Sequence, residues 1–356
     1  MTIRDIPGKW TPTIEIDFGL AYEFLISMLI WNDDREQYPY EIGNEWFEAA
    51  RDKVSPELLK DIERLGNCSD RGWINLLGLA YECAPPKDVP TFIERVRATD
   101  ALELRLHMIG YYQRRTRRTT PLDVILQAAE GDVEAQRQFL KTSFREDSDW
   151  QEKLRYIFSI DPETMKSAFL DIFSAWYEQV FCEMEFQVLP ILQRDAAARQ
   201  ALKATMPPER LIETATNGLE YVPEPSLRKV LLIPSFIERP WNNFSEYHDM
   251  KIYCYPVADE SVAKDSTIPP ARLVRLYKAL ADERRLRILK MLMTRSYSLQ
   301  EIADEFGVAK TTMHHHLATL RTAGLVLARP NESQYSLRHN MLSEVGELLN
   351  AYLKGK

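Results

Sequence analysis

Along most of the N-terminal part of the chain, apolar residues recur at the three- and four-residue spacing of amphipathic helices. SPELLKDIERLG begins with Ser55 and Pro56, and TTPLDVILQAAEG begins with Thr120 and Pro121, which are residue types that favour the start of a helix. Residues 161–186 are rich in apolar and aromatic side chains and predict a central buried helix. The pattern therefore predicts a mostly helical N-terminal region, which we call the body.

Three stretches of the body break this helical pattern. Residues 13–18, TIEIDF, alternate with period two, and residues 229–236, KVLLIPSF, form a short apolar run. Residues 251–257, KIYCYPV, are rich in β-branched and aromatic side chains. We expect three strands that pack together as a small sheet against the helices.

The segment VADESVAKDSTIPPARL has the composition of a domain boundary. It is small, polar and charged, and its Pro269 and Pro270 can open a helix but not continue one. We therefore place a boundary near residue 265. This divides the chain into the body, residues 1–265, and a C-terminal region, residues 266–356.

The C-terminal region contains short amphipathic segments with clear start and stop signals. Asp282 can cap the helix ERRLRILKMLM, and Ser298 and Glu301 have the spacing of a capping box, so a further helix starts there. Gly307 supplies a turn, and Gly324 closes the helix that follows. Apolar spacing predicts that ERRLRILKMLM buries Leu286, Leu289, Leu292 and Met293.

Two short helices joined by a Gly-containing turn form a helix-turn-helix, whose second helix enters the DNA major groove. The segment after it, LVLARPNESQYSLR, alternates and carries a Pro-Asn-Glu-Ser tip, which predicts the β-hairpin, or wing, of a winged helix. The last segment, NMLSEVGELLNAYL, carries an apolar stripe that must pack on its own domain, on the body or on a second copy. The predicted fold class is mainly α, with the large helical body and its small sheet followed by a C-terminal winged helix-turn-helix domain.

This C-terminal region resembles the ArsR-type winged-helix repressors. The resemblance is carried by LADERRLRIL, residues 280–289, and by EIADEFGVAKTTMHHHLATLRTAGLV, residues 301–326, followed by the hairpin. Two positions depart from the family pattern. Glu283 stands where the family often has Pro, and Ala309 stands where a Ser cap is common, which should weaken that helix end by about 1 kcal/mol.

The resemblance implies a partner and an assembly. ArsR-type repressors bind double-stranded DNA as homodimers, and the first and last helices of the domain, here residues 271–281 and 340–353, make the dimer contact. Two recognition helices one turn apart match a palindromic operator. The body is similar to uncharacterised domains that precede some ArsR-type winged helices, through TIEIDFG, LLIPSF and KIYCYP. That second resemblance brings no known ligand.

Three consecutive histidines, His314, His315 and His316, lie in the predicted recognition helix. Successive helical residues point about 100° apart, so the three cannot reach one metal ion. We expect Met313, Leu317 and Leu320 to form the buried stripe. The exposed side that meets bases and phosphates should carry Lys310, Thr311, His314 and His315, whereas His316 is expected to be a partly buried residue that packs or contacts a phosphate. Each polar residue has the alternative of being a solvated face. The candidate DNA-binding residues are Lys310, Thr311, Thr312, His314, His315, Arg321, Arg329 and Arg338.

No metal, cofactor or catalytic site is expected. ArsR-type metal sensors use a Cys pair before the recognition helix or Asp and His on the last helix, but SYSLQEIA has no Cys and only His339 precedes the last helix. His248, Asp249 and Cys254 flank a predicted strand irregularly. A nucleophile elbow, a P-loop, a dinucleotide fingerprint and an HExxH motif are all missing from the sequence. The cysteines form no CxxC unit and are expected to be reduced thiols: Cys68, Cys83, Cys182 and Cys254.

The net charge of −8 hides an asymmetry between the two regions. From Ile268 onward the chain holds 14 Lys and Arg against 8 Asp and Glu, a balance of +6, and the remainder holds 31 against 45, a balance of −14. Only the C-terminal region is therefore suited to meet a polyanion. The start of the chain lacks a secretory signal, and the apolar residues 20–31 are too few to span a bilayer, so we expect a cytoplasmic protein without a membrane partner.

Together these features predict an ArsR-type transcriptional regulator that binds a palindromic operator as a homodimer, as the repressors it resembles do. The body is expected to sense an unknown, non-metal signal such as a small-molecule effector, or to add dimer surface, and the sign of regulation is left open by the sequence. The alternatives are an enzyme or ligand-binding protein fused to a DNA-binding tail, and a protein-docking module with a vestigial winged helix. The basic run Arg114–Arg118 could hold an anion or the DNA backbone, or form a solvated helix end. Five tryptophans in predicted helices could line an effector pocket or the core: Trp31, Trp46, Trp73, Trp150 and Trp176.

Overall fold

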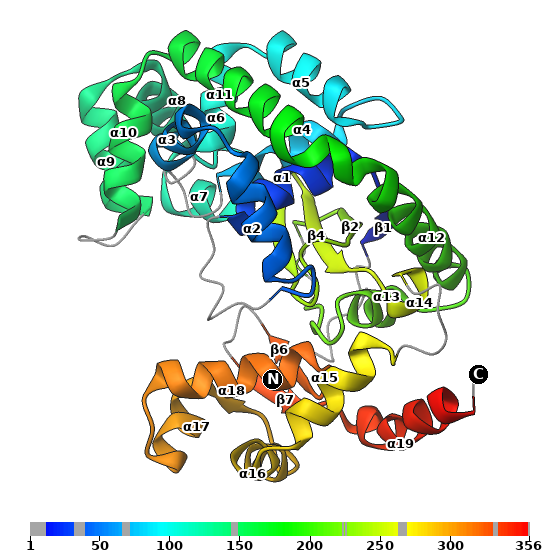
Figure 1. Ribbon diagram of the computed structural model, residues 1–356. Coiled ribbons are helices and arrows are strands. Elements are labelled where there is room, and N and C mark those ends of the chain that lie inside the picture. The colour runs from blue at the N-terminus through cyan, green and yellow to red at the C-terminus, as the bar shows by residue number, and fades with distance from the viewer. Residues whose placement is uncertain are drawn as a thin grey trace.

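The computed structural model describes most of the chain in two regions that contact each other (Figure 1). The described residues are 12–31, 40–65, 72–143, 149–222, 224, 226–262, 269–329 and 334–354. The predicted boundary near residue 265 lies outside them.

The three strands predicted in the body are confirmed as β1 (Thr13–Ile16), β2 (Lys229–Ser235) and β4 (Met250–Pro256). They form one sheet in the order β1-β2-β4-β3, in which β1, β2 and β4 run parallel. A fourth strand, β3 (Asn243–Tyr247), pairs antiparallel with β4 and was not predicted. Its sequence, NFSEY, is mostly polar because it lies at the edge of the sheet.

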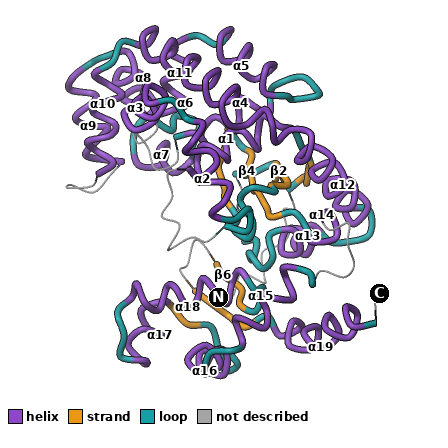
Figure 2. The backbone as a smooth tube through the Cα atoms, in the orientation of Figure 1, coloured by secondary structure: helices purple, strands orange, loops and turns teal. Residues whose placement is uncertain are grey.

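Both faces of this sheet are buried, which explains why β2 reads as a continuous apolar run. Leu231 and Ile233 of β2 point into the large core beside α1 (Leu20–Trp31), whereas Val230 and Leu232 point into a smaller core. The smaller core is covered by α13 (Pro208–Ala215). The body is therefore a layered α/β unit with a large helical insertion between β1 and β2, and Figure 2 shows helices on both sides of the strands.

The other helices of the body lie mainly in that insertion. Their bounds are α2 Asn44–Lys53, α3 Pro56–Leu65, α4 Leu77–Tyr81, α5 Val89–Ala98, α6 Ala101–Met108, α7 Arg114–Thr119, α8 Leu122–Glu130, α9 Val133–Ser143, α10 Asp149–Ser159, α11 Pro162–Trp176, α12 Glu185–Lys203 and α14 Asp259–Val262, with a 3-10 turn at Trp73–Leu76. Among the described residues, no helix is both long and apolar enough to cross a bilayer.

The long helix predicted over residues 161–186 is confirmed as a continuous helical path, but its hydrogen-bond pattern changes along its length. Asp161 caps α11 by accepting from Thr164 N at 3.0 Å. After Trp176 the chain passes through a π-helical turn, Tyr177–Phe181, and a 3-10 turn, Cys182–Met184, into α12. These tighter and wider turns shift the helix register where aromatic side chains crowd the core.

The C-terminal winged helix-turn-helix is confirmed with its caps. Its elements are α15 Ala271–Leu280, α16 Glu283–Leu292, β5 Tyr297–Ser298, α17 Leu299–Phe306, α18 Lys310–Thr322, β6 Val326–Arg329, β7 Gln334–Leu337 and α19 His339–Leu353. Asp282 caps α16, and Ser298 and Glu301 form the expected capping box at α17. Gly307 and Gly324 both take positive φ, at 62° and 74°, which closes α17 and the turn after α18.

The predicted buried face of α16 was partly wrong. Leu289 and Leu292 are buried as expected, but Leu286 and Met293 are 49% and 53% exposed, and Ile288 is fully buried. The helix is rotated toward Ile288 because α16 packs against both α18 and β7, and that inward side is centred between Ile288 and Leu292. Leu286 and Met293 therefore lie on the flank of the helix.

Candidate nucleic-acid interface

The recognition helix α18 is held by its apolar residues and presents its polar residues on the surface. Met313, Leu317 and Leu320 are fully buried in the core of the winged helix, as predicted. Ala309 precedes the helix with extended backbone and supplies no side-chain cap. The first N–H groups of α18 are therefore not capped by the residue that precedes it, as in helix ends that bind phosphate.

The polar residues of the first two turns of α18 lie together. Lys310, Thr311, Thr312 and His315 are exposed, and His314 is half-buried. With about 100° between successive residues, Lys310, Thr311, His314 and His315 fall within an arc of about 140° on one side of the helix. This arc is the one part of the chain where predicted base-contacting residues are both gathered and accessible in the described structure.

The histidines differ in their surroundings. Burial and the nearby charges of Arg321 and His315 lower the pKa of His314 below its ordinary value, so its imidazole is neutral at pH 7 and can both donate and accept a hydrogen bond. Burial also lowers the pKa of His316, whose Nδ1 has no hydrogen-bond partner among the described residues. His316 lies close enough to Asp282 to feel its charge, which fits the predicted packing position rather than a base contact.

The three arginines predicted to contact phosphates lie outside the polar arc in the first two turns of α18. The Arg321 guanidinium lies 5.7 Å from the centre of the Trp241 ring, and Arg338 Nε lies 3.1 Å from Glu213 Oε1, so both side chains contact the body. Arg329 ends β6, and its side chain lies outside the described part of the structure. The body residues at this contact, Glu213 and Trp241, were not identified from sequence because nothing in their local pattern marks them.

The basic run of the body is tied to the sheet edge. Arg114 is buried, and its Nη1 donates to Glu224 Oε2 at 2.8 Å while its backbone N–H donates to Glu246 at 2.9 Å. Arg117 donates to the backbone oxygen of His248 at 2.9 Å. Arg118 is exposed and lies 3.8 Å from Glu224. The run therefore fastens α7 to residues 224–248 and leaves Arg118 facing solvent.

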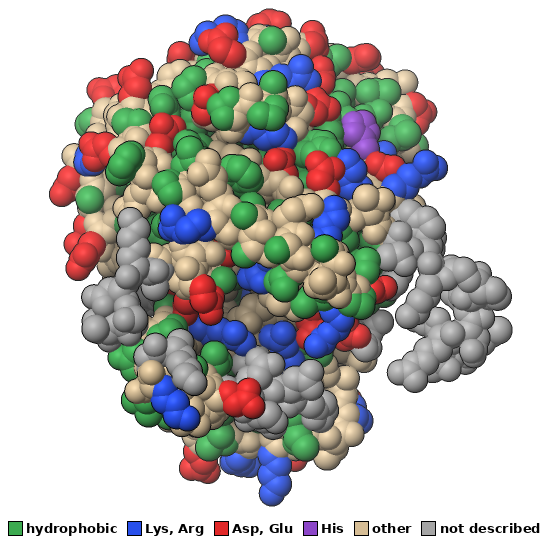
Figure 3. Space-filling model, turned by 90° about the vertical axis from the view of Figure 1, so that its right-hand side faces the viewer, with side chains coloured by type: hydrophobic (Ala, Val, Ile, Leu, Met, Phe, Trp, Pro, Cys, Tyr) green, Lys and Arg blue, Asp and Glu red, His purple; other side chains and the backbone are tan. Residues whose placement is uncertain are grey.

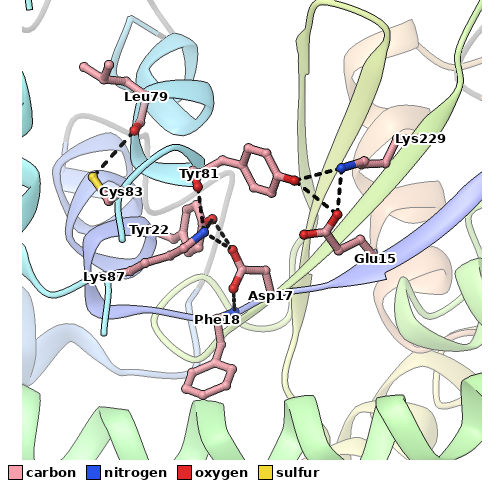
Figure 4. Close-up of polar contacts among 9 residues, drawn as sticks. All are labelled: Glu15, Asp17, Phe18, Tyr22, Leu79, Tyr81, Cys83, Lys87 and Lys229. Atoms are coloured by element: carbon pink, nitrogen blue, oxygen red, sulfur yellow. Dashed lines mark hydrogen bonds and ion pairs between the residues drawn. The ribbon is translucent and has the colours of Figure 1, made fainter. Parts of the chain in front are cut away.

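The charged side chains near the end of β1 pair with one another. Figure 4 shows Lys87 pointing toward Asp17 and Tyr22, with Nζ at 2.5 Å from Asp17 Oδ2 and 2.7 Å from the Tyr81 backbone oxygen. A neighbouring set joins Lys229 to Glu15 at 2.8 Å. Burial raises the pKa of Tyr22, which opposes a role as a nucleophile or base. These contacts fasten the end of β1 to the loop before α5.

His248, Asp249 and Cys254 do not gather into a metal site in the described part of the structure. Cys254 is fully buried in the large core, and Asp249 lies 3.7 Å from Arg228. Within the described ranges, no group of three His, Cys, Asp or Glu residues has the geometry to hold a metal ion. Cys83, Cys182 and Cys254 are free thiols, and Cys68 lies outside the described residues.

The comparison with known proteins agrees with this geometry. A family described as "Bacterial regulatory protein, arsR family" matches residues 282–327. The C-terminal region is 39% identical over 83 residues to the transcriptional activator HlyU of Vibrio cholerae serotype O1, which covers 22% of this chain and 76% of HlyU. The chain belongs to the arsR family of bacterial regulatory proteins.

Other relatives match the same arsR-family region. The HTH-type transcriptional regulator CmtR of Mycobacterium bovis is 34% identical over 84 residues, 23% of this chain and 71% of CmtR. The uncharacterised HTH-type transcriptional regulator YceK of Bacillus subtilis is 39% identical over 57 residues, 15% of this chain and 57% of YceK. No solved structure matches the chain. The arsR-family match covers residues 282–327 and does not include the body.

Proposed function

We propose that this arsR-family regulator reads the DNA major groove with α18, through Lys310, Thr311, Thr312, His314 and His315. The observation that carries the proposal is the exposed polar arc on a helix whose opposite side is anchored in its own core. Lys310 is suited to a guanine edge or a phosphate, and the threonines to phosphates at the helix start or a thymine methyl group. Arg321, Arg329 and Arg338 add contacts to the backbone.

The assembly that fits this function is a homodimer on a palindromic operator. α15 exposes Val274 and Tyr277, and α19 exposes Leu353 at 70%, which leaves apolar surface on the two helices expected to join two copies. A two-fold axis between the copies would set their recognition helices one turn apart. Because chromosomal DNA is the target, the dimer acts in the cytoplasm.

The body is proposed as the sensor. It responds to a non-metal signal, such as a small-molecule effector, by favouring one arrangement of the winged helices over another, since a ligand with equal affinity for both would switch nothing. The mode we propose is repression, in which the dimer occupies its operator and excludes the transcription machinery. A reporter gene placed behind the selected operator should fall in output when the protein is present, and a rise would identify an activator.

The direct test is selection of binding sites from a pool of random duplex DNA with the purified full-length protein. We expect enrichment of a two-fold symmetric sequence whose affinity falls steeply with salt, because phosphate contacts release counterions. Failure to enrich any sequence at low salt would overturn the proposed function. Enrichment of a sequence without symmetry would retain DNA reading and overturn the dimer.

A further inference from the structure

The outer edge of the wing is occupied by the body. In the β6–β7 hairpin, Arg338 N donates to Leu325 O at 3.1 Å. The backbone N–H and C=O groups of Leu327 and Arg329 are therefore directed at β7 as well, and those of Ala328, the residue between them, are directed outward. Ala328 N donates to Gly218 O at 3.3 Å, and Glu220 N donates to Ala328 O at 3.3 Å. Residues 217–220, which we call the docking segment, are thus joined to the wing by a single parallel β-bridge between Leu219 and Ala328.

The docking segment also holds the end of the recognition helix. Asn217, which has a positive φ of 54°, donates from Nδ2 to the backbone oxygen of Thr322 at 3.0 Å. The approach is so close that a Cβ at Gly324 would lie 2.6 Å from Asn217 Oδ1. The Asn217 side chain therefore lies directly against the turn that follows α18.

Two arginines proposed to contact phosphates, Arg321 and Arg338, contact body residues instead. The ion pair of Arg338 with Glu213 is mostly shielded, with both side chains 14% exposed. Arg321 lies over the ring of Trp241. Glu213 brings a carboxylate to the wing, and the body as a whole carries a balance of −14. The docked body therefore neutralises or covers positive charge on the winged helix.

A second attachment holds the other end of the winged helix. Asp259 accepts from the backbone N–H of Arg272 at the start of α15 at 2.6 Å, and it also pairs with Arg239. Glu41 lies 3.0 Å from Arg239 and pairs with Arg275 of α15. Figure 3 shows that the surface is hollowed between the two regions, with Lys and Arg side chains gathered around the hollow. The winged helix is thus held at α15 and at the wing.

We propose that docking of residues 217–220 on the wing is an autoinhibitory contact that lowers affinity for DNA. Release of the docking segment would free Arg321 from Trp241 and Arg338 from Glu213, so that both cations become available to phosphates. The proposal rests on the proposed function, because it assigns the regulation of that same surface. The docking segment follows α13, and Leu219 packs in the smaller core with Leu211 and Tyr253, so a change at that sheet face reaches the wing directly.

The test changes only the body, so that every residue proposed to touch DNA is kept. The double variant Glu213→Gln and Asn217→Gly removes the ion pair and the bond to Thr322, while Gly tolerates the positive φ of Asn217. We expect the full-length variant to bind the selected operator about tenfold more tightly. The logarithmic salt slope should steepen by about 1, because freed Arg338 gains a phosphate.

A matched control uses the same helix. Glu209→Gln removes an equal charge from the first turn of α13, one turn before Glu213, and its operator affinity should equal that of the wild type. If Glu209→Gln strengthens binding as much as the double variant, general charge repulsion accounts for the effect and the docking proposal fails.

A second variant reaches the contact from the wing. Ala328→Pro removes the N–H that Gly218 accepts but none of the bonds between β6 and β7, so it should also raise affinity. Unchanged or weaker binding by both variants, with wild-type circular dichroism, would overturn the inference while leaving the proposed function intact. Absence of operator binding by the wild type and by every variant would instead overturn the proposed function.

Discussion

Two polar, basic stretches, Arg114–Arg118 and residues 310–315, have similar compositions but different surroundings in the fold. Arg114–Arg118 carries more positive charge than any part of α18, yet Arg114 is buried against Glu224 and Arg117 bonds a backbone oxygen. Residues 310–315 carry a single Lys, yet their side chains stand largely exposed on a helix anchored from behind. The presence of compensating carboxylates and carbonyl groups, and not charge density, distinguishes a structural cluster from a surface that can bind.

The largest expected effect tests the exposed stretch. Changing Lys310, His314 and His315 together to Ala should weaken operator binding at least about a hundredfold, because three contacts are lost at once and each good contact contributes about 1–3 kcal/mol. Gel-shift titration at fixed salt measures it. The control is Lys290→Ala, an exposed Lys on α16, which should leave the affinity nearly unchanged. Unaltered operator affinity in the triple variant would contradict the assignment of α18.

The buried stretch should instead control stability. Arg114→Ala leaves Glu224 without its closest partner, and breaking a buried ion pair costs about 3–5 kcal/mol in the free energy of unfolding. Burial alone would raise the pKa of Glu224, but Lys251 and Arg114 together hold it below its ordinary value. Urea unfolding measures the loss. Arg118→Ala, on the same helix but exposed, should change the free energy of unfolding little. Equal losses in the two variants would contradict the stabilising role assigned to the buried Arg114–Glu224 pair.

A third prediction concerns Glu23, an uncompensated carboxyl group in the body. It is fully buried and accepts from Phe236 N and Ile237 N at 2.8 and 2.6 Å, and burial raises its pKa to about 7. Because the folded pKa exceeds the unfolded one, the folded state binds the proton more tightly, and stability falls as the pH rises from about 4.5 to 7.

Glu23→Gln keeps a carbonyl acceptor for the two N–H groups but cannot ionise. Its free energy of unfolding should therefore rise relative to wild type by about 3 kcal/mol between pH 5 and pH 8. Urea unfolding at the two pH values provides the comparison. A constant difference between the two proteins would show that Glu23 does not titrate in this range.

The smallest expected effect is a gain in stability of the winged helix from a new helix cap. Ala309→Ser places a hydroxyl where extended backbone already suits a cap, and it should add about 1 kcal/mol of stability at the start of α18. The opposite change at the neighbouring helix, Ser298→Ala, should remove a similar amount because the capping box is lost. Thermal unfolding of the two variants should shift in opposite directions, and shifts of the same sign would contradict the capping explanation.

The sequence was most informative where local signals specify local structure. The caps at Asp282 and Ser298 and the turn at Gly307 were predictable because each depends on residues within one helical turn. The strand β3 was missed because an edge strand with one partner needs few apolar residues. The parallel register of β1 with β2 and the rotation of α16 depend on elements that meet only in the folded chain.

The candidate site likewise contains features that local sequence predicts and features that it does not. The polar arc of α18 followed from helical spacing, whereas the contacts of Arg321 and Arg338 with the body did not. Glu213 and Trp241 come from separate segments of the body, and no periodic pattern links them to the wing. Long-range ion pairs and ring contacts of this kind become visible only when the two regions are placed together.

The pairing of β1 with β2 has a consequence for synthesis of the protein. Thr13 lies opposite Lys229, so a ribosome adding about 5–20 residues per second needs roughly 10–40 s between making the two partners. During that interval α1, in which every residue from Leu20 to Ile30 is destined for the interior, lacks the sheet it will pack against. The nascent chain is therefore most prone to self-association before translation reaches β2, and a chaperone that shields apolar helices would act there.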